Sequence, residues 1–161
     1  MSEHTDVEEQ TEESAETINC EKFLVFSIME KYYCFPSRLI GEIALFDAVY
    51  PLPLMPSYVL GIVNRYSTPY ALFDTGLLFQ KKPCPRKKVL ILKEEIDRVA
   101  FLIDDITAIA NIQNEEIFNI EKKSDSNEFA DEINASFKWN DNDVFVIDAN
   151  KIINRVSEEL I

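Results

Sequence analysis

The chain has 161 residues, enough for one domain or for two small subdomains that share a core. Its formal net charge of −13 argues against nucleic acid or an anionic membrane as partner, because Lys and Arg dominate phosphate binding. With 47% hydrophobic residues, and no apolar run near the roughly 18 residues of a membrane span, the composition indicates a soluble globule without direct membrane insertion.

Much of the negative charge lies at the start of the chain. Residues 1–20 hold seven acidic residues and no Lys or Arg, which indicates a solvated, disordered arm. The arm also lacks the basic start and apolar centre of a secretory signal. Cys20, Cys34 and Cys84 are widely spaced and form no Cys-x-x-Cys pair, so we expect reduced thiols in a cytoplasmic protein.

Hydrophobic alternation predicts short strands through the first half of the chain. The run after Lys22 is hydrophobic at odd and even positions alike, which is typical of a strand covered on both faces. Residues 44–55 carry apolar side chains that a simple surface loop would not, so part of this loop must fold back or meet a partner. The predicted elements are strands at Phe23–Met29 and Tyr32–Phe35 with a turn at Glu30 and Lys31, a strand at Leu39–Ile43, strands at Val59–Val63 and Ala71–Phe73 with a turn at Asn64–Thr68, and a turn or short helix at Asp74–Phe79.

A basic, proline-containing segment, Gln80–Lys88, divides the chain and is typical of a solvated connector. Beyond it, residues 121–132 are polar, and we expect them to be mobile. After Asp148, apolar residues recur at helical spacing, so we predict a final helix capped by Asp148. Nine or ten short strands with little helix favour barrels or a sandwich. The predicted strands of this half are Val89–Leu92, Arg98–Asp104, Ile106–Ile112, Ala135–Trp139 and Val144–Ile147.

Residue types needed for common catalytic and cofactor sites are missing. The one histidine, His4, lies in the acidic arm, so no histidine-based triad or metal site can be assembled. Three glycines cannot supply a phosphate-cradling loop. Asp104 and Asp105 are interpreted as turn formers, although acid/base chemistry by paired carboxylates stays open. We expect no metal, no cofactor and no enzymatic activity.

The strands and the motifs between them resemble a CheW-like domain, the coupling protein of bacterial chemotaxis, over residues 22–160. The resemblance implies an all-β fold with a C-terminal helix, built as two side-by-side five-stranded SH3-like barrels. The first barrel would span about residues 36–84 and the second about 88–148, with the terminal segments packing across both. The matching residues are Phe23–Phe26, Tyr33, Glu42-Ile43, Pro53, Pro56, Gly61–Asn64, Asp74, Val99–Asp104 and Val144–Ile161.

The resemblance implies a non-catalytic adaptor that links chemoreceptor cytoplasmic tips to the regulatory domain of a CheA-type histidine kinase. It implies a kinase-binding surface near Glu42, Ile43 and the Asn64 turn. It also implies a groove between the barrels, lined by Leu39, Ile62 and Val99, for a helical receptor tip. The binding residues implied are Leu39, Glu42, Ile43, Gly61, Ile62, Asn64, Arg65, Tyr66 and Val99.

The chain departs from the family pattern directly after Asn64. Where the family has Leu-Arg-Gly, this chain has Arg65, Tyr66 and Ser67, and Ala71 replaces a proline. Any ion pair of the family's arginine should be lost, because Arg65 should point to the other face of its strand. Without a glycine, the turn must suit a residue with a side chain or carry strain.

Three alternatives remain open. The first is a divergent paralogue with an altered receptor or array partner. The second comes from another class, a small β-barrel protein that binds a ligand or performs acid/base chemistry through Asp104 or Asp105. The third is a structural homo-oligomer assembled through the Ala44–Met55 loop.

Overall fold

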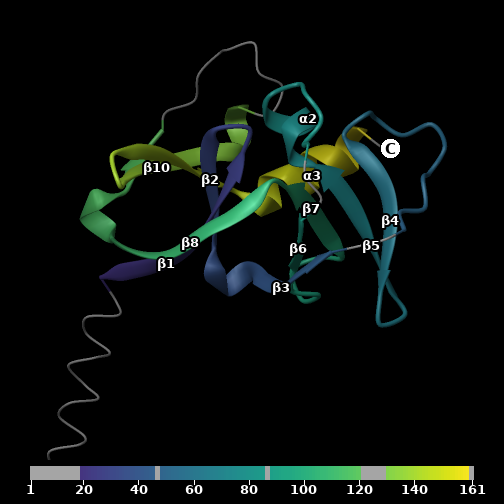
Figure 1. The fold of residues 1–161 in the computed structure, drawn as a ribbon, viewed down its shortest axis with the longest axis horizontal. Helices are drawn as coiled ribbons and strands as arrows, with labels where there is room; N and C mark the ends of the chain where they lie inside the picture. The colour runs from purple at the N-terminus through teal and green to yellow at the C-terminus, as the bar shows by residue number, and fades with distance from the viewer. Residues whose placement is uncertain (1–18, 46–47, 86–87, 121–129, 160–161) are drawn as a thin grey trace, which may run out of the picture.

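Two β-sheets and a C-terminal helix make up the chain in a computed structural model, which describes residues 19–45, 48–85, 88–120 and 130–159 (Figure 1). The predicted acidic arm lies outside these residues except for its last two, and Cys20 already belongs to the first strand. The strands are β1 Cys20–Ile28, β2 Lys31–Pro36, β3 Ile40–Leu45, β4 Val59–Arg65, β5 Thr68–Asp74, β6 Lys88–Leu92, β7 Val99–Ile103, β8 Asp105–Gln113, β9 Phe118–Asn119, β10 Ile133–Trp139 and β11 Asn142–Ile147. The helices are α2 Thr75–Phe79 and α3 Ala149–Glu159, with short 3-10 turns η1 Ser37–Leu39, η2 Asn114–Glu116 and η3 Ala130–Glu132.

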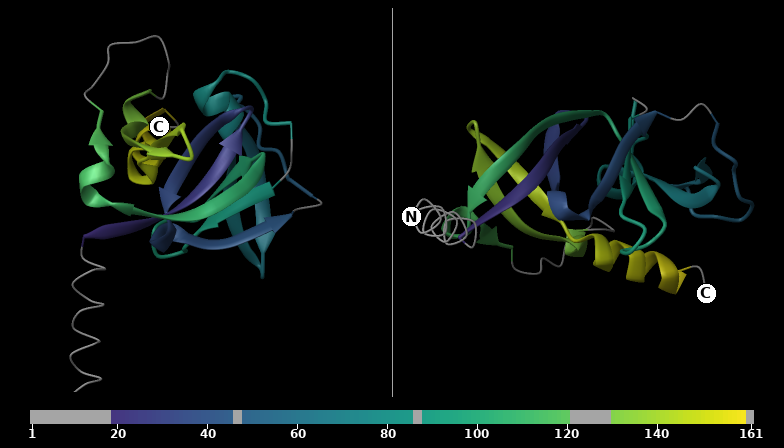
Figure 2. Two further views of the ribbon diagram at one scale, coloured as in Figure 1. Left: turned by 60° about the vertical axis from the view of Figure 1, so that its left-hand side comes forward. Right: turned by 90° about the horizontal axis from the view of Figure 1, so that it is seen from below.

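The strands form a six-stranded sheet in the order β8-β1-β2-β11-β10-β9 and a five-stranded sheet in the order β3-β6-β7-β5-β4. The predicted all-β class with a C-terminal helix is confirmed. The prediction of two five-stranded barrels is wrong in detail, because one sheet has six strands and neither sheet closes. Within the described residues, no backbone pairing joins β3 to β4 or β8 to β9. The sheets lie side by side in both views of Figure 2.

The division of strands between the sheets differs from the predicted boundaries at 36–84 and 88–148. β6 and β7 follow the connector, yet they join β3, β4 and β5. β1 and β2, from the start of the chain, join the strands from β8 onward. Four pairings between strands distant in the sequence produce this exchange. Two are antiparallel, β3 with β6 and β1 with β8, and two are parallel, β5 with β7 and β2 with β11. Local alternation cannot reveal such pairings, because it reports which face of a strand is buried and not which strand lies beside it.

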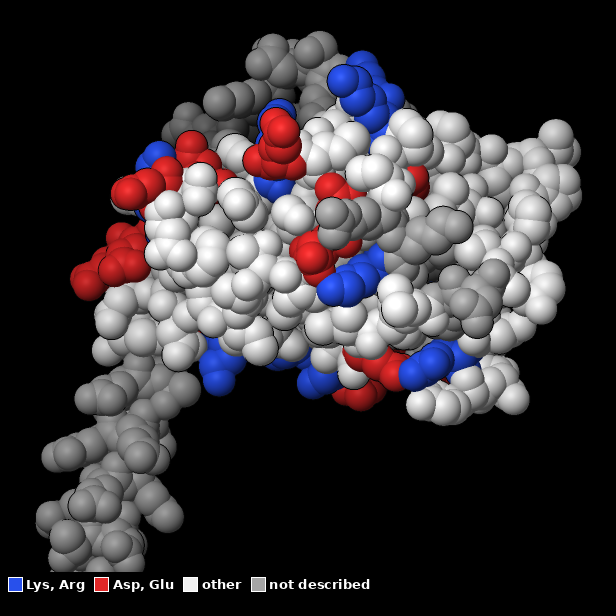
Figure 3. All heavy atoms as spheres, viewed as in Figure 1, with Lys and Arg blue, Asp and Glu red and all other residues white. Residues whose placement is uncertain are grey.

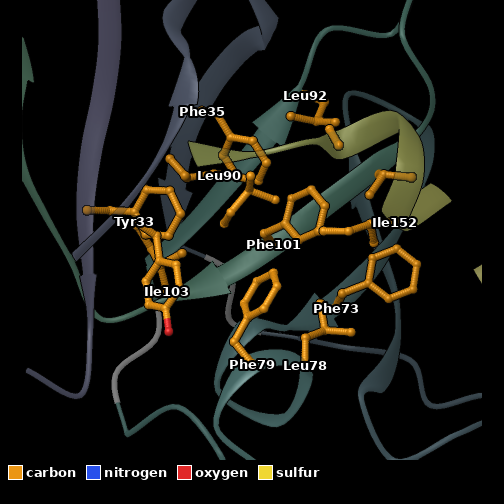
Figure 4. Packing of buried hydrophobic residues seen from close by; sticks show 14 of the residues in the cluster. Tyr33, Phe35, Phe73, Leu78, Phe79, Leu90, Leu92, Phe101, Ile103 and Ile152 are labelled. Atoms are coloured by element: carbon orange, nitrogen blue, oxygen red, sulfur yellow. The ribbon is translucent and has the colours of Figure 1, made fainter. Parts of the chain in front are cut away.

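Both faces of the central strands are buried, as predicted for β1. Its Phe23 and Val25 pack into a core on one face of the six-stranded sheet, whereas Leu24 and Phe26 face a second core between the sheets. A third core, around Val63, lines the outer face of the five-stranded sheet. Figure 4 shows aromatic and aliphatic side chains from both sheets meeting in the core between the sheets, which we call the middle core. Each fully buried large apolar side chain stabilises the fold by about 1.5–3 kcal/mol.

Helix α3 begins between the two sheets and runs alongside the five-stranded sheet, as the view from below shows (Figure 2). Its predicted cap is confirmed, since the Lys151 N–H donates to Asp148 Oδ1 at 3.2 Å. The helix buries Ile152 and Val156 in the middle core. Residues 160–161, which follow the helix, lie outside the described residues.

Helix α3 also makes polar contacts beside each of the two sheets. Arg155 donates to the buried Glu132 at 3.4 Å, beside the six-stranded sheet. The Tyr58 hydroxyl, just before β4 of the five-stranded sheet, donates to Glu159. The helix therefore ties the two sheets together by side chains as well as by its apolar face.

Three hairpins turn on two residues that both have positive φ, the geometry of type I′ turns. Only the third, at Asn140 and Asp141, uses residue types that favour this backbone. The β1–β2 turn is formed by Met29 and Glu30, one residue earlier than predicted, because Ile28 pairs with Lys31. The β4–β5 turn is formed by Tyr66 and Ser67, with φ of 49° and 66°. Side chains at such φ angles carry strain.

Candidate partner-binding site

Residues 48–58 lie against the free edge of β4 because Gly61 lets the backbone approach closely. The N–H groups of Tyr50 and Ile62 each donate to the other residue's carbonyl at 2.8 Å. Gly61 has a φ of 140°, and a Cβ there would lie 2.2 Å from the Tyr50 carbonyl oxygen. No residue with a side chain fits this position without displacing the segment.

Exposed apolar side chains of this segment and of β3 form a surface that we call the apolar end. Leu54 is fully exposed and Leu45, at the end of β3, is 71% exposed. Residues 48–64 contain no charged residue, and Figure 3 shows an uncharged right-hand margin with charges only at its rim. Exposed apolar surface without interspersed charge marks interaction sites. The exposed apolar residues of the apolar end are Ile43, Leu45, Val49, Tyr50, Leu52 and Leu54.

An ion pair joins the two edge strands of the five-stranded sheet. Arg65, in β4, donates from Nε to a carboxylate oxygen of Glu42, in β3, at 2.8 Å, and from Nη2 to the other oxygen. The long side chain of Arg65 thus reaches across the open seam to β3. The loss of any ion pair made by the family's arginine stays a prediction. The Arg65 hydrogen bond holds the pKa of the Glu42 carboxyl below its usual range.

The aromatic ring of Tyr66 stands at the tip of the β4–β5 hairpin. The residue is 83% exposed, and the Arg65 guanidinium carbon lies 4.5 Å from its ring centroid. This cation–π contact, together with the Glu42 pair, orders three side chains in a row on the surface. Asn64, one residue before Arg65, is exposed.

A hollow of about 450 Å³ opens beside this row. Gly41, Thr68 and the nearly buried Tyr70 line it on one side, and the β6–β7 turn lines it on the other. The turn contributes Glu94 and Glu95. The seam between the edge strands is thus a concave surface whose lining includes the Tyr66 ring and the acidic residues Glu94 and Glu95.

The family model for the CheW-like domain matches residues 22–157 of the chain. This chain belongs to the CheW-like family. Among solved structures, it is similar to the scaffolding protein TtCheW from Thermoanaerobacter tengcongensis, with a TM-score of 0.70 and 16% sequence identity over 79% of this chain and 88% of that one. At that identity the likeness concerns the fold alone. No curated protein matches the chain.

In this CheW-like structure, the three residues predicted to line one groove, Leu39, Ile62 and Val99, are not equally accessible. Ile62 pairs with Ala71, and Ala71 pairs with Val99. Ile62, Ala71 and Val99 therefore form one row across the sheet. Val99 is only 5% exposed and belongs to the middle core. Leu39 lies in η1, not in a strand, and packs against the same core.

The carboxylates considered for acid/base chemistry hold the CheW-like fold together. The oxygens of Asp104 accept hydrogen bonds from the Met29 N–H at 2.7 Å and the Cys84 thiol at 2.8 Å. Asp105 pairs with Lys88. Both residues thus connect segments that are distant in the sequence.

Asp74 is 2% exposed and caps α2, accepting from the Gly76 and Leu77 N–H groups at 2.8 and 3.3 Å. Its carboxylate also accepts from the Cys84 N–H at 3.1 Å, so it anchors the connector. Burial raises the pKa of Asp74, and the charge of Asp104 adds to this effect. In the described parts of the chain, no three metal-ligating side chains gather and no helix is long and apolar enough to cross a membrane.

The sequence predicted the loop at residues 44–55 as a segment that folds back or meets a partner, and the structure shows that it supplies much of the apolar end. Glu95 was missed as a lining residue of the hollow. A single acidic residue in a predicted turn carries no signal of what lies opposite it. The absence of charge from residues 48–64 is a signal that was available in the sequence.

Proposed function

We propose that this CheW-like chain is a non-catalytic cytoplasmic adaptor of chemotaxis, which couples chemoreceptor tips to the regulatory domain of a CheA-type histidine kinase. The observation that supports it best is the apolar end, an exposed surface without charge on an otherwise acidic protein. Groups of exposed apolar side chains are rare on monomeric proteins and mark interaction sites. A scaffold that works by protein–protein contact needs such a surface.

The kinase contact would use the apolar end together with Glu42, Ile43 and the hairpin that starts at Asn64. Ile43 is exposed on β3 beside Glu42, and it belongs to the apolar end. A buried apolar centre with a polar rim is the usual anatomy of such an interface. Here the Glu42–Arg65 pair would form part of that rim.

The receptor tip would dock at the row of Ile62, Ala71 and Val99, with Leu39 beside it. Because Val99 is buried, the exposed parts of Ile62 and Leu39 would provide most of the contact. This part of the proposal follows from the family resemblance, and the burial of Val99 limits how much area the row offers.

A divergent paralogue with its own partner set is favoured by one observation. Tyr66, where the family pattern has arginine, is among the most exposed large side chains of the described chain. An exposed aromatic residue at a position where the chain departs from the family pattern is suited to discriminate between partners, since Tyr and Trp are enriched among interface residues that dominate affinity.

The decisive experiment measures binding by calorimetry to a purified kinase regulatory domain and to a receptor tip fragment from the same cell. Leu54→Asp should weaken kinase binding at least tenfold, because it places a charge in the centre of the apolar end. Phe118→Asp is the matched control, since Phe118 is an exposed apolar residue on β9 in the other sheet. Absence of binding to both partners would refute the adaptor proposal, and equal effects of both variants would refute the assignment of the surface.

A further inference from the structure

The tip of the β4–β5 hairpin holds an aromatic side chain under conditions that folding alone does not explain. Tyr66 is 83% exposed, so its ring gains little from burial. It also occupies a positive φ of 49° beside Ser67 at 66°. Non-glycine residues at such angles cost of order 1 kcal/mol or more, and strained residues gather at functional sites.

The ring is held in place before any partner arrives. Arg65 lies 4.5 Å from its centroid and is itself fixed by two hydrogen bonds to Glu42. With Arg65 on one face, the exposed area of Tyr66 comes from its opposite face and its edges. Side chains ordered in advance lose less conformational entropy on binding.

The side chains that line the hollow beside the ring carry a net negative charge. Its lining holds three carboxylates, from Glu42, Glu94 and Glu95, and two cations, from Arg65 and Lys93. Glu42 is paired with Arg65, and Glu94 pairs at 3.1 Å with Arg98 outside the hollow. Among the described residues, Glu95 has no ion pair, which makes it the carboxylate most available to a partner.

We infer that this hollow receives an arginine side chain of the protein partner, with the guanidinium against the open face of Tyr66 and paired with Glu95. Arginine both stacks on aromatic faces and pairs with carboxylates in a planar geometry. The chain already contains this arrangement once, in Arg65 between Glu42 and Tyr66. The inference rests on the proposed adaptor function and names the chemistry of the partner at that surface.

The positive charge of Arg65 behind the ring does not oppose this binding strongly. Glu42 neutralises that charge through a bidentate pair. The acidic balance of the lining, and of the protein as a whole, favours an incoming cation. A partner acid would meet Lys93 but would also face Glu95 and the paired Glu94.

A first experiment tests the hollow without the kinase. The isotope-labelled chain is titrated with N-acetyl-arginine methylamide and, separately, with N-acetyl-glutamate methylamide, and backbone amide shifts are recorded. The arginine compound should shift amides at residues 66–68 and 93–95, and the glutamate compound should not. Equal responses, or no response to the arginine compound, would overturn the inference.

A second experiment uses the purified kinase regulatory domain. Tyr66→Leu should weaken binding roughly 3- to 30-fold, the range of a cation–π contact, and Tyr66→Phe should keep most of it. Glu95→Gln should also weaken binding, whereas Glu116→Gln, a change of an exposed residue on η2, should not. Unchanged affinity in Tyr66→Leu and Glu95→Gln would overturn the inference while leaving the adaptor function intact. If the unaltered chain does not bind the kinase domain, the adaptor function fails, and the titration still decides whether the hollow binds arginine.

Discussion

Arg65 and Glu42 pair across the two strands that form the open edges of the five-stranded sheet, with Nε 2.8 Å from a carboxylate oxygen. The pair therefore bridges a seam that backbone hydrogen bonds leave open. It also means that β4 supplies a cation to Glu42 although residue 66 is a tyrosine. The departure from the family pattern at Tyr66 thus changes the hairpin tip and leaves a cation at the seam.

Replacing Glu42 by Gln should remove a pH-dependent part of the stability. Since Arg65 lowers the folded-state pKa of Glu42, its stabilisation is present above the unfolded-state pKa and is lost as the pH falls through the folded-state pKa. The difference in free energy of unfolding between the unaltered chain and Glu42→Gln should therefore shrink on acidification. Urea unfolding at a series of pH values measures it, and a difference that grows in acid would contradict the assignment.

Ser67→Gly should stabilise the chain by about 0.5–1 kcal/mol. Glycine accepts the φ of 66° without strain, although it loses more backbone entropy on folding. For a chain of this length we expect a rise in melting temperature of about 2–4 °C per kcal/mol. Thr68→Gly, one residue later in β5, is the control and should destabilise. A fall in stability for Ser67→Gly would show that the serine side chain contributes more than the strain costs.

Gly61→Ala should destabilise the chain by about 2–4 kcal/mol, because the new Cβ would meet the Tyr50 carbonyl at a strained φ of 140°. Residues 48–58 should detach from β4, so the Tyr50 and Ile62 amides should exchange faster with solvent. Gly41→Ala is the matched control, since a Cβ there would lie 3.3 Å from the nearest atom, the Leu92 carbonyl oxygen. Similar losses in the two variants would contradict the close-approach explanation.

Asp74 should show a pH signature opposite to that of Glu42. Burial raises its folded-state pKa, so its contribution to stability is fully present below the unfolded-state pKa and is lost as the pH rises through the folded-state pKa. Relative to Asp74→Asn, the unaltered chain should gain stability on acidification. At neutral pH, Asp74→Ala should cost about 1–2 kcal/mol through loss of the α2 cap. Denaturant unfolding checks both, and parallel pH profiles for Asp74→Asn and Glu42→Gln would contradict them.

The sequence predicted those features that depend on local pattern. The hydrophobic run of β1 correctly indicated burial on both faces, and Asp148 correctly indicated the start of α3. The absence of a glycine at Ser67 indicated that the turn either suits a residue with a side chain or carries strain. The structure shows strain there, since Ser67 has a positive φ. In each case the residues whose pattern carries the prediction lie within a few positions of one another in the sequence.

Features that depend on distant segments were not predictable in this way. The contact of Arg65 with Glu42 was missed because local alternation does not reveal that β3 and β4, the two edges of one sheet, face each other across an open seam. The membership of β6 and β7 in the five-stranded sheet was missed because it depends on pairing between strands that are distant in the sequence, β6 with β3 and β7 with β5. Leu39 was placed in a strand, although the chain makes a 3-10 turn after Pro36.

The parallel pairing of β2 with β11 has a consequence for how the chain is made. During synthesis, the β1–β2 hairpin leaves the ribosome long before the residues that cover its edge, Val144–Val146, exist. Until then the apolar edge of β2 stays open to other chains, as edge strands readily pair with one another. Completion of the six-stranded sheet must therefore wait until Val144–Val146 have been made, and folding that depends on such remote contacts is slow.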